Sequence, residues 1–179
     1  MRVIAGSCRG RLLCAPAGTV TRPTSDRVRE AIFNVLGSLI ELEGMAVADL
    51  FAGSGAMGIE AISRGADSVV FVDDAPSALR AIRDNLAKLG IEDRARVVRE
   101  DVLRFIGRSQ DFDLALCDPP YEFEGWDALL SGLRAPLAVL ESRRPVEVPV
   151  SWEVIKNKRY GGTLVTVVRS LGAHEKGTR

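Results

Sequence analysis

Short apolar runs alternate with amphipathic stretches over most of this chain. From residue 46 onward, runs suited to strands are Ala46–Phe51, Ser68–Val72, Ala95–Arg99, Phe112–Cys117 and Leu137–Leu140. Between them, apolar residues recur at helical spacing in Ala56–Arg64, Pro76–Leu89, Val102–Gly107 and Trp126–Arg134. Strands this apolar, alternating with helices, predict a parallel sheet that is covered on both faces.

The N-terminal part departs from this alternation. Two short segments suited to strands, Arg2–Ala5 and Arg11–Ala15, flank a turn that contains glycine, which predicts a small β-hairpin. After the extended segment around Pro23, Thr24 or Ser25 can cap a helix that runs to Leu39. We therefore expect the chain to begin with a hairpin and helix extension.

The C-terminal part departs from the alternation in another way. The strand candidates Ser151–Asn157 and Thr163–Arg169 are joined by a segment too short for a crossover helix, so they should form an antiparallel pair. The predicted fold class is α/β and Rossmann-like. It consists of a seven-stranded, mostly parallel sheet with this antiparallel C-terminal pair and the small N-terminal hairpin and helix extension.

Length and composition are those of an ordinary globular chain. The 179 residues are 46% hydrophobic and 27% charged, which is enough for one sizeable core. We expect three parts: the basic extension at 1–40, the core at 41–171 and a flexible tail at 172–179. No apolar run approaches the ~20 residues that span a bilayer, and the N-terminus lacks the apolar stretch of a signal peptide.

Cysteine and histidine usage speaks against metal and disulfide chemistry. Cys8, Cys14 and Cys117 are far apart and show no metal-ligand spacing, and the single histidine is His174. We therefore expect no metal site and a location in the reducing cytoplasm. We also expect no membrane association and a monomeric protein.

The formal net charge of zero hides an uneven distribution. Residues 1–39 hold six arginines against two carboxylates, and residues 143–179 hold eight basic residues against three glutamates. Residues 40–142 hold ten basic and nineteen acidic residues. Basic ends on an acidic middle can form a phosphate-binding rim. Charge alone favours the plainer interpretation of solvated surface residues.

A glycine loop follows the first predicted core strand. Gly53 to Gly58 fits the pattern G-x-G-x-x-G at the start of a helix, and Asp73 follows Gly53 by twenty residues. Glycines allow a tight turn and a close approach of a nucleotide-like cofactor, while the acid can accept ribose hydroxyls. A purely structural turn is the alternative. The predicted contacts here are Phe51, Ala52, Gly53, Ser54, Gly55, Gly58 and Asp73.

The pattern alone does not choose between NAD and S-adenosylmethionine. No histidine or Tyr-Lys pair is placed for hydride transfer. Asp49, just before the loop, would repel a pyrophosphate but suits a cofactor with an ammonium group and a sulfonium. We therefore favour S-adenosylmethionine. Asp101, after the third strand, can accept from an adenine amine or cap the following helix.

A second motif, Asp118-Pro119-Pro120-Tyr121, follows an apolar strand. The Asp118 carboxylate and the Pro119 carbonyl can accept both hydrogens of an exocyclic amine, which directs the nitrogen lone pair at a methyl donor. Pro120 restricts the turn, and Tyr121 offers a face on which a base can stack. The alternative is a plain strand-terminating turn.

These motifs resemble class I methyltransferases that depend on S-adenosylmethionine, and more narrowly the bacterial 16S rRNA guanine-N2 methyltransferase D family. The narrower resemblance rests on Thr21–Glu30 with Phe33-Asn34, on Asp49–Ala61 and on Asp118–Tyr121. It implies methylation of a guanine N2 in small-subunit rRNA, within an assembled particle. The residues expected to contact the RNA are Arg9, Arg11, Arg22, Thr24, Arg27, Pro120 and Tyr121.

Several alternatives stay open at the level of sequence. Arg27 and Arg29 can contact phosphate or pair with Asp26 and Glu30 on the helix surface. An adenine-N6 or cytosine-N4 DNA methyltransferase would use the same Asp-Pro-Pro-Tyr turn. An NAD-dependent oxidoreductase and a non-catalytic RNA-binding module are the other two candidates.

Overall fold

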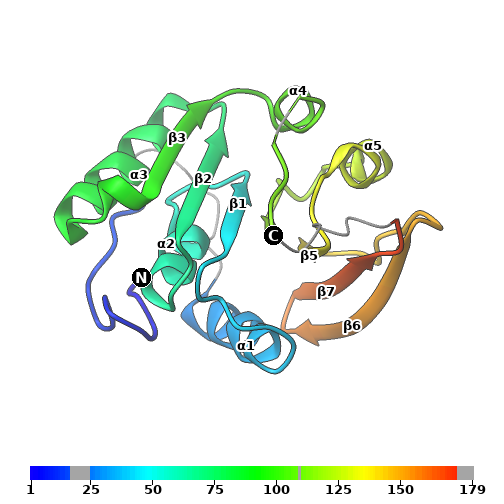
Figure 1. Ribbon diagram of the computed structural model, residues 1–179, viewed down its shortest axis with the longest axis horizontal. Helices are drawn as coiled ribbons and strands as arrows, with labels where there is room; N and C mark the ends of the chain where they lie inside the picture. Colours follow the sequence, from blue (N-terminus) through cyan, green and yellow to red (C-terminus); the bar gives the residue numbers. More distant parts are fainter. Residues whose placement is uncertain (17–24, 109, 173–179) are drawn as a thin grey trace, which may run out of the picture.

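The computed structural model describes residues 1–16, 25–108 and 110–172 (Figure 1). The predicted contacts Arg22 and Thr24, together with His174 and the tail from 173, lie outside these residues. The helices are α1 (Asp26–Gly37), α2 (Ala56–Ser63), α3 (Pro76–Leu89), α4 (Val102–Ile106) and α5 (Trp126–Gly132), with a short 3-10 turn at Glu92–Arg94. The strands are β1 (Ala46–Leu50), β2 (Ser68–Asp73), β3 (Ala95–Arg99), β4 (Leu114–Cys117), β5 (Leu137–Ser142), β6 (Trp152–Tyr160) and β7 (Thr163–Ser170).

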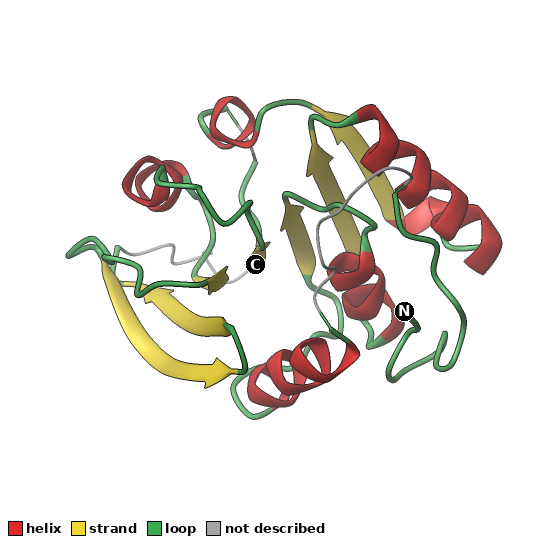
Figure 2. Cartoon of the chain, turned by 180° about the vertical axis from the view of Figure 1, so that it is seen from behind, coloured by secondary structure: helices red, strands yellow, loops and turns green. Residues whose placement is uncertain are grey.

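The seven strands form one sheet in the order β3-β2-β1-β4-β5-β7-β6. Strands β1 to β5 pair in parallel, whereas β5 with β7 and β7 with β6 pair antiparallel. This confirms the predicted mostly parallel sheet with its antiparallel C-terminal pair, which forms one curved edge of the molecule (Figure 2). The direction of strand addition reverses between β1 and β4, where open α/β sheets bind ligands at the carboxyl ends of the strands.

Two apolar cores cover the two faces of the sheet. On one face, residues of α1, α2 and α3 such as Ile32, Ile59 and Ile82 pack with alternate strand residues. On the other face, α4 and α5 contribute residues such as Phe105 and Leu129. Strands β1, β2, β4 and β5 therefore have both faces covered, which explains why they read as continuous apolar runs.

The N-terminal extension forms the predicted hairpin in a shorter form. An antiparallel bridge joins Arg2 to Leu12, and backbone hydrogen bonds link Val3 with Arg11 and with Gly10, and Leu13 with Met1. The pairing stops there because α2 binds the next backbone groups. The amides of Ile4 and Ala5 donate to the Glu60 carboxylate at 2.7 and 3.0 Å. The extension thus uses its backbone groups to attach to α2.

Buried charges fasten the same extension to the core. Arg29 and Glu60 are both 0% exposed, and the Arg29 Nε lies 3.7 Å from Glu60 Oε2. Arg64 also donates to Glu60, at 2.7 Å, and Arg29 donates to Asp26 and to the carbonyl of Arg2. For Arg29 the ion-pair alternative is therefore confirmed, because its buried guanidinium is not accessible to a phosphate.

Candidate functional site

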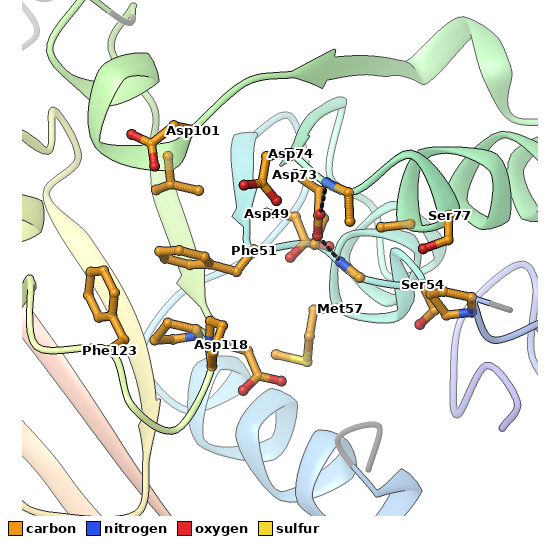
Figure 3. A pocket seen from close by; sticks show the side chains of 18 of the residues that line it. Asp49, Phe51, Ser54, Met57, Asp73, Asp74, Ser77, Asp101, Asp118 and Phe123 are labelled. Atoms are coloured by element: carbon orange, nitrogen blue, oxygen red, sulfur yellow. Dashed lines mark hydrogen bonds between the residues drawn. The ribbon is translucent and has the colours of Figure 1, made fainter. Parts of the chain in front are cut away.

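A cavity of about 930 Å³ opens at the carboxyl ends of β1, β2 and β4, beside the point where the strand order reverses. Figure 3 shows side chains that line it. The structure brings both sequence motifs to this one cavity. The predicted residues that line it are Asp49, Phe51, Ala52, Gly53, Ser54, Asp73, Asp101, Asp118, Pro119, Pro120 and Tyr121.

The glycines of the loop have different roles. Gly53 has φ +55°, and a Cβ added to it would meet nothing nearer than the Phe51 carbonyl oxygen at 3.9 Å, so its open side leaves room for a ligand. Gly58 does not line the cavity. A Cβ there would lie 2.4 Å from the Phe71 ring, so Gly58 allows α2 to pack closely on β2. Gly55, with φ +75°, forms the left-handed turn that begins α2.

Asp73 at the end of β2 holds the glycine loop in place. Its Oδ2 accepts from the Gly53 amide at 2.8 Å and its Oδ1 accepts from the Ala75 amide at 2.9 Å (Figure 3). A carboxylate has about four acceptor positions, so two remain for hydroxyl groups of a ligand. Asp73 therefore both shapes the loop and faces the cavity.

Asp49 is a buried carboxyl group beneath the cavity, only 3% exposed. Burial raises the pKa of Asp49 well above its usual value, against the hydrogen bond from the Gly58 amide, which lowers it, and the negative charges of Asp118 and Asp73 raise it further. That hydrogen bond is 2.8 Å long. A cation placed in the cavity would favour the ionised form of Asp49.

The charge of the cavity selects among ligands. Its lining carboxylates are Asp49, Asp73, Asp74, Glu100, Asp101, Asp118 and Glu122. Among the described lining residues, the one cationic side chain is that of Arg143. This excess of negative charge disfavours the pyrophosphate of a dinucleotide and fits a ligand that carries an ammonium group and a sulfonium. Together with the open side of Gly53, it fits S-adenosylmethionine.

Asp101 caps α4, as one of its two interpretations predicts. Its side chain accepts from the Arg104 amide at 3.0 Å. The residue is exposed and also lines the cavity, so the cap leaves acceptor capacity for an adenine amine.

The Asp-Pro-Pro-Tyr turn is supported by Phe51, which the sequence assigned to the cofactor, and by two aromatic residues that sequence reasoning did not assign to the site, Phe123 and Trp126. Phe51 has a positive φ of 60°, unusual for a residue with a side chain. Its ring meets Phe123 edge-on at 5.1 Å, and Phe123 meets Trp126 at 5.2 Å. Such contacts link the loop after β1 to the loop after β4. The Phe123 amide also donates to the Pro120 carbonyl at 2.9 Å, which fixes the turn.

Tyr121 is 45% exposed at the mouth of the cavity, and its ring is in contact with a cationic side chain. The guanidinium carbon of Arg143 lies 3.5 Å from the ring centroid, a cation–π contact. Sequence reasoning missed Arg143 because it belongs to the stretch after β5 that follows neither the strand nor the helix pattern.

Asn85 on α3 was also missed, although it ties the extension to the glycine loop. It is 0% exposed. Its Oδ1 accepts from the Cys14 amide at 2.8 Å, and its Nδ2 donates to the carbonyls of Cys14 and Ser54 at 2.9 and 3.0 Å. Both Ser54 and Pro16, two residues beyond Cys14, line the cavity. An asparagine within a helical pattern gives no signal of this kind.

Among the described residues of the extension, the structure does not bring the predicted RNA contacts Arg9, Arg11 and Arg27 to the cavity. The Arg11 guanidinium donates to the Lys88 carbonyl at the end of α3, near the amino edge of the sheet. Arg9 lies two residues after Ser7. The Ser7 amide donates to the carbonyl of Ser63 at the end of α2, near the same edge of the sheet. Arg27 is exposed on α1 and is not among the lining residues.

Some chemistries are not represented in the described part of the chain. No group of three or more His, Cys, Asp or Glu side chains there could hold a metal ion. None of its helices has the length and apolarity needed to cross a membrane.

The residue that precedes Asp118 is Cys117, whose thiol is buried. Burial raises its pKa, and the charges of Asp49 and Asp118 raise it further, so it stays protonated.

Comparison with known proteins agrees with this architecture. YlbH of Bacillus subtilis, a candidate rRNA methyltransferase, is 38% identical to this chain. The alignment covers 96% of this chain and 100% of YlbH. The ribosomal RNA small subunit methyltransferase D of Escherichia coli K12 is 34% identical, with 90% of this chain and 85% of that protein covered. The structure of yhhF from Escherichia coli, a candidate methyltransferase, superposes with a TM-score of 0.83 at 30% identity, over 95% and 97% of the two chains.

The fold is therefore that of the class I methyltransferases. The sequence profile of one family, described as Conserved hypothetical protein 95, matches residues 1–169, which is nearly the whole chain. By this match and by the identity to the curated relatives, the chain belongs to that family, whose members include small-subunit rRNA methyltransferases.

Proposed function

We propose that this protein transfers a methyl group from S-adenosylmethionine to the exocyclic N2 amine of a guanine in 16S rRNA. The observation that carries the proposal is one cavity that joins a carboxylate-lined half, reaching from Asp49 to Asp101, to the Asp118–Tyr121 turn. The relatives named as small-subunit rRNA methyltransferases support the choice of nucleic acid.

The cofactor fits the half of the cavity lined by the glycine loop. Gly53 and Ser54 would face its amino-acid part, above the Asp49 carboxylate. Asp73 would accept from the ribose hydroxyls and Asp101 from the adenine amine. When bound, S-adenosylmethionine would supply a methyl group carried on a sulfonium, and the leaving group would be a neutral thioether.

The residues of the turn orient the amine. Asp118, half-buried after β4, would accept one N–H through its carboxylate, and the Pro119 carbonyl would accept the other. This arrangement directs the nitrogen lone pair at the methyl group and stabilises the positive charge that develops on nitrogen. The proton lost after transfer passes to the Asp118 carboxylate and from there to water.

Substitution of Asp118 tests the mechanism. We expect Asp118→Ala to lower kcat by about 10²–10³-fold, because a group that stabilises developing charge is lost. S-adenosylmethionine affinity, measured by calorimetry, should stay within a few-fold. Asp127→Ala, an exposed aspartate on α5 that does not line the cavity, is the matched control. Retained activity in Asp118→Ala would remove the proposed mechanism.

The choice of substrate is tested with labelled cofactor. Purified small ribosomal subunits, free 16S rRNA and duplex DNA are offered in parallel, and the methylated base is identified by mass spectrometry. We expect N2-methylguanine in the assembled particle. Incorporation only into DNA, at adenine N6 or cytosine N4, would overturn the assignment. Binding of NADH without binding of S-adenosylmethionine would favour an oxidoreductase instead.

We also propose that the protein acts as a monomer in the cytoplasm. Light scattering coupled to gel filtration tests the first statement, and fractionation of cells tests the second.

A further inference from the structure

We propose that the end of the β6–β7 hairpin and the segment after β5 form a phosphate-binding surface for the rRNA strand that enters the cavity. We call these residues the hairpin cations: Arg143, Arg144, Lys156, Lys158 and Arg159. The inference rests on the proposed function, since it assumes an RNA substrate at the Asp118–Tyr121 turn.

The register of the strands places the end of the β6–β7 hairpin at the edge of the sheet where the cavity opens. Cys117 of β4 pairs with Leu140 of β5, so Ser142 lies level with the Asp-Pro-Pro-Tyr turn. Ser142 pairs in turn with Leu164 of β7, which pairs with Arg159 of β6. Arg159 therefore ends a row of paired residues that runs from this turn across β5 and β7.

Direct contacts connect this row to the mouth of the cavity. The Arg159 guanidinium donates to the Arg143 carbonyl at 3.3 and 3.4 Å. The Arg143 side chain in turn lies over Tyr121. One path of cationic groups thus leads from the proposed base-binding turn to the outer strand of the sheet.

The hairpin cations are available to a partner. All five are exposed, and none forms an ion pair with an acidic residue among those the structure describes. The cations of the extension differ. Arg29 is buried against Glu60, and Arg11 is bonded to α3. Of these two groups of cations, the hairpin cations are therefore the ones that adjoin the cavity, through Arg143.

Protection of an edge strand is the competing explanation, because lysines on outer strands prevent pairing between sheets. It accounts for Lys156 and Lys158 on β6. It does not account for Arg143 and Arg144, which follow β5 outside any strand. A nucleic-acid surface accounts for both sets, because its phosphates need cations along a continuous path.

The salt dependence of binding distinguishes the two explanations. Dissociation constants for purified small ribosomal subunits are measured against KCl concentration for the wild type, for Lys158→Gln/Arg159→Gln and for Arg143→Gln. Each lost phosphate contact should reduce the slope of log K against log salt by about 0.7–0.9. The KM for the particle should rise several-fold, with S-adenosylmethionine affinity unchanged for the double variant. The matched control is Arg80→Gln/Arg83→Gln, an equal loss of charge on the exposed side of α3.

The outcomes separate this inference from the function on which it rests. Slopes equal to that of the wild type in both hairpin variants would overturn the phosphate surface, even if methylation is normal. A reduced slope in the hairpin variants but not in the α3 control would support it. Failure of the wild type to methylate rRNA would instead contradict the proposed function. Arg143→Gln keeps the test valid if the strand variant aggregates, because Arg143 lies outside the edge strand.

Discussion

The N-terminal extension and the β6–β7 hairpin flank the same core and carry the same kind of charge, but the structure uses that charge differently. In the extension, Arg29 is withdrawn from water and bound to Glu60. In the hairpin, Lys158 and Arg159 are exposed beside the cavity. A count of basic residues treats the two ends alike. Burial separates Arg29 from the hairpin cations, because a paired and buried cation contributes to the fold while an exposed one can meet a partner.

The largest expected effect on stability comes from removing the buried carboxylate that binds the extension to α2. Glu60→Ala removes the acceptor for the amides of Ile4 and Ala5 and takes away one of the two carboxylates paired with the buried Arg29. We expect a loss of about 3–5 kcal/mol in the free energy of unfolding, measured by urea denaturation. Glu153→Ala, an exposed glutamate of the hairpin, should change it by less than about 0.5 kcal/mol. Equal effects at the two positions would contradict the contrast.

A smaller effect is expected from uncharged polar groups on the two flanks. Asn85→Ala leaves the Cys14 amide and two carbonyls without their partner, which should cost about 1–3 kcal/mol. Asn157→Ala on the exposed part of β6 is the matched substitution and should be near neutral. Because Asn85 bridges Cys14 and Ser54, its loss should also weaken S-adenosylmethionine binding, measured by calorimetry. Unchanged stability and affinity in Asn85→Ala would show that the bridge is dispensable.

The smallest expected effect concerns Asp49, the buried carboxyl group of the core between the extension and the hairpin. It is measured as the pH dependence of stability and of ligand affinity. The raised pKa of Asp49 means that the folded protein without ligand holds this proton more tightly than the unfolded chain. Its contribution to stability is therefore complete below the ordinary aspartate pKa and is lost as pH rises through the raised value. A cationic ligand prefers the ionised form, so its affinity should fall as pH falls through the raised pKa.

One proton limits that change to about tenfold in affinity per pH unit, or about 1.4 kcal/mol. Calorimetry with S-adenosylmethionine at several pH values measures it. Asp49→Asn should bind more weakly and lose this part of the pH dependence. A dependence that persists unchanged in Asp49→Asn would assign the titration to another group.

Local patterns predict the elements and the two motifs of the cavity well, for physical reasons. Alternating apolar runs determine which segments are strands, and parallel strands bring their carboxyl ends to one edge, so Gly53 and Asp118 had to converge. Long-range contacts are not visible in such patterns. The role of Arg143 depends on the register of β5 against β4, and that of Asn85 on the path of the extension. Glu60 looks like an ordinary helix-surface glutamate until the extension covers it.

Glu60 also limits how this protein can change during evolution. Its carboxylate sits on the helix that follows the glycine loop, yet it receives hydrogen bonds from Ile4 and Ala5. A recombination event that replaced the first 40 residues would deprive this buried charge of two of its donors, unless position 60 changed in the same step. The beginning of the chain and the helix behind the glycine loop should therefore be inherited as one unit, and chimaeric genes that join them from distant relatives should give unstable proteins.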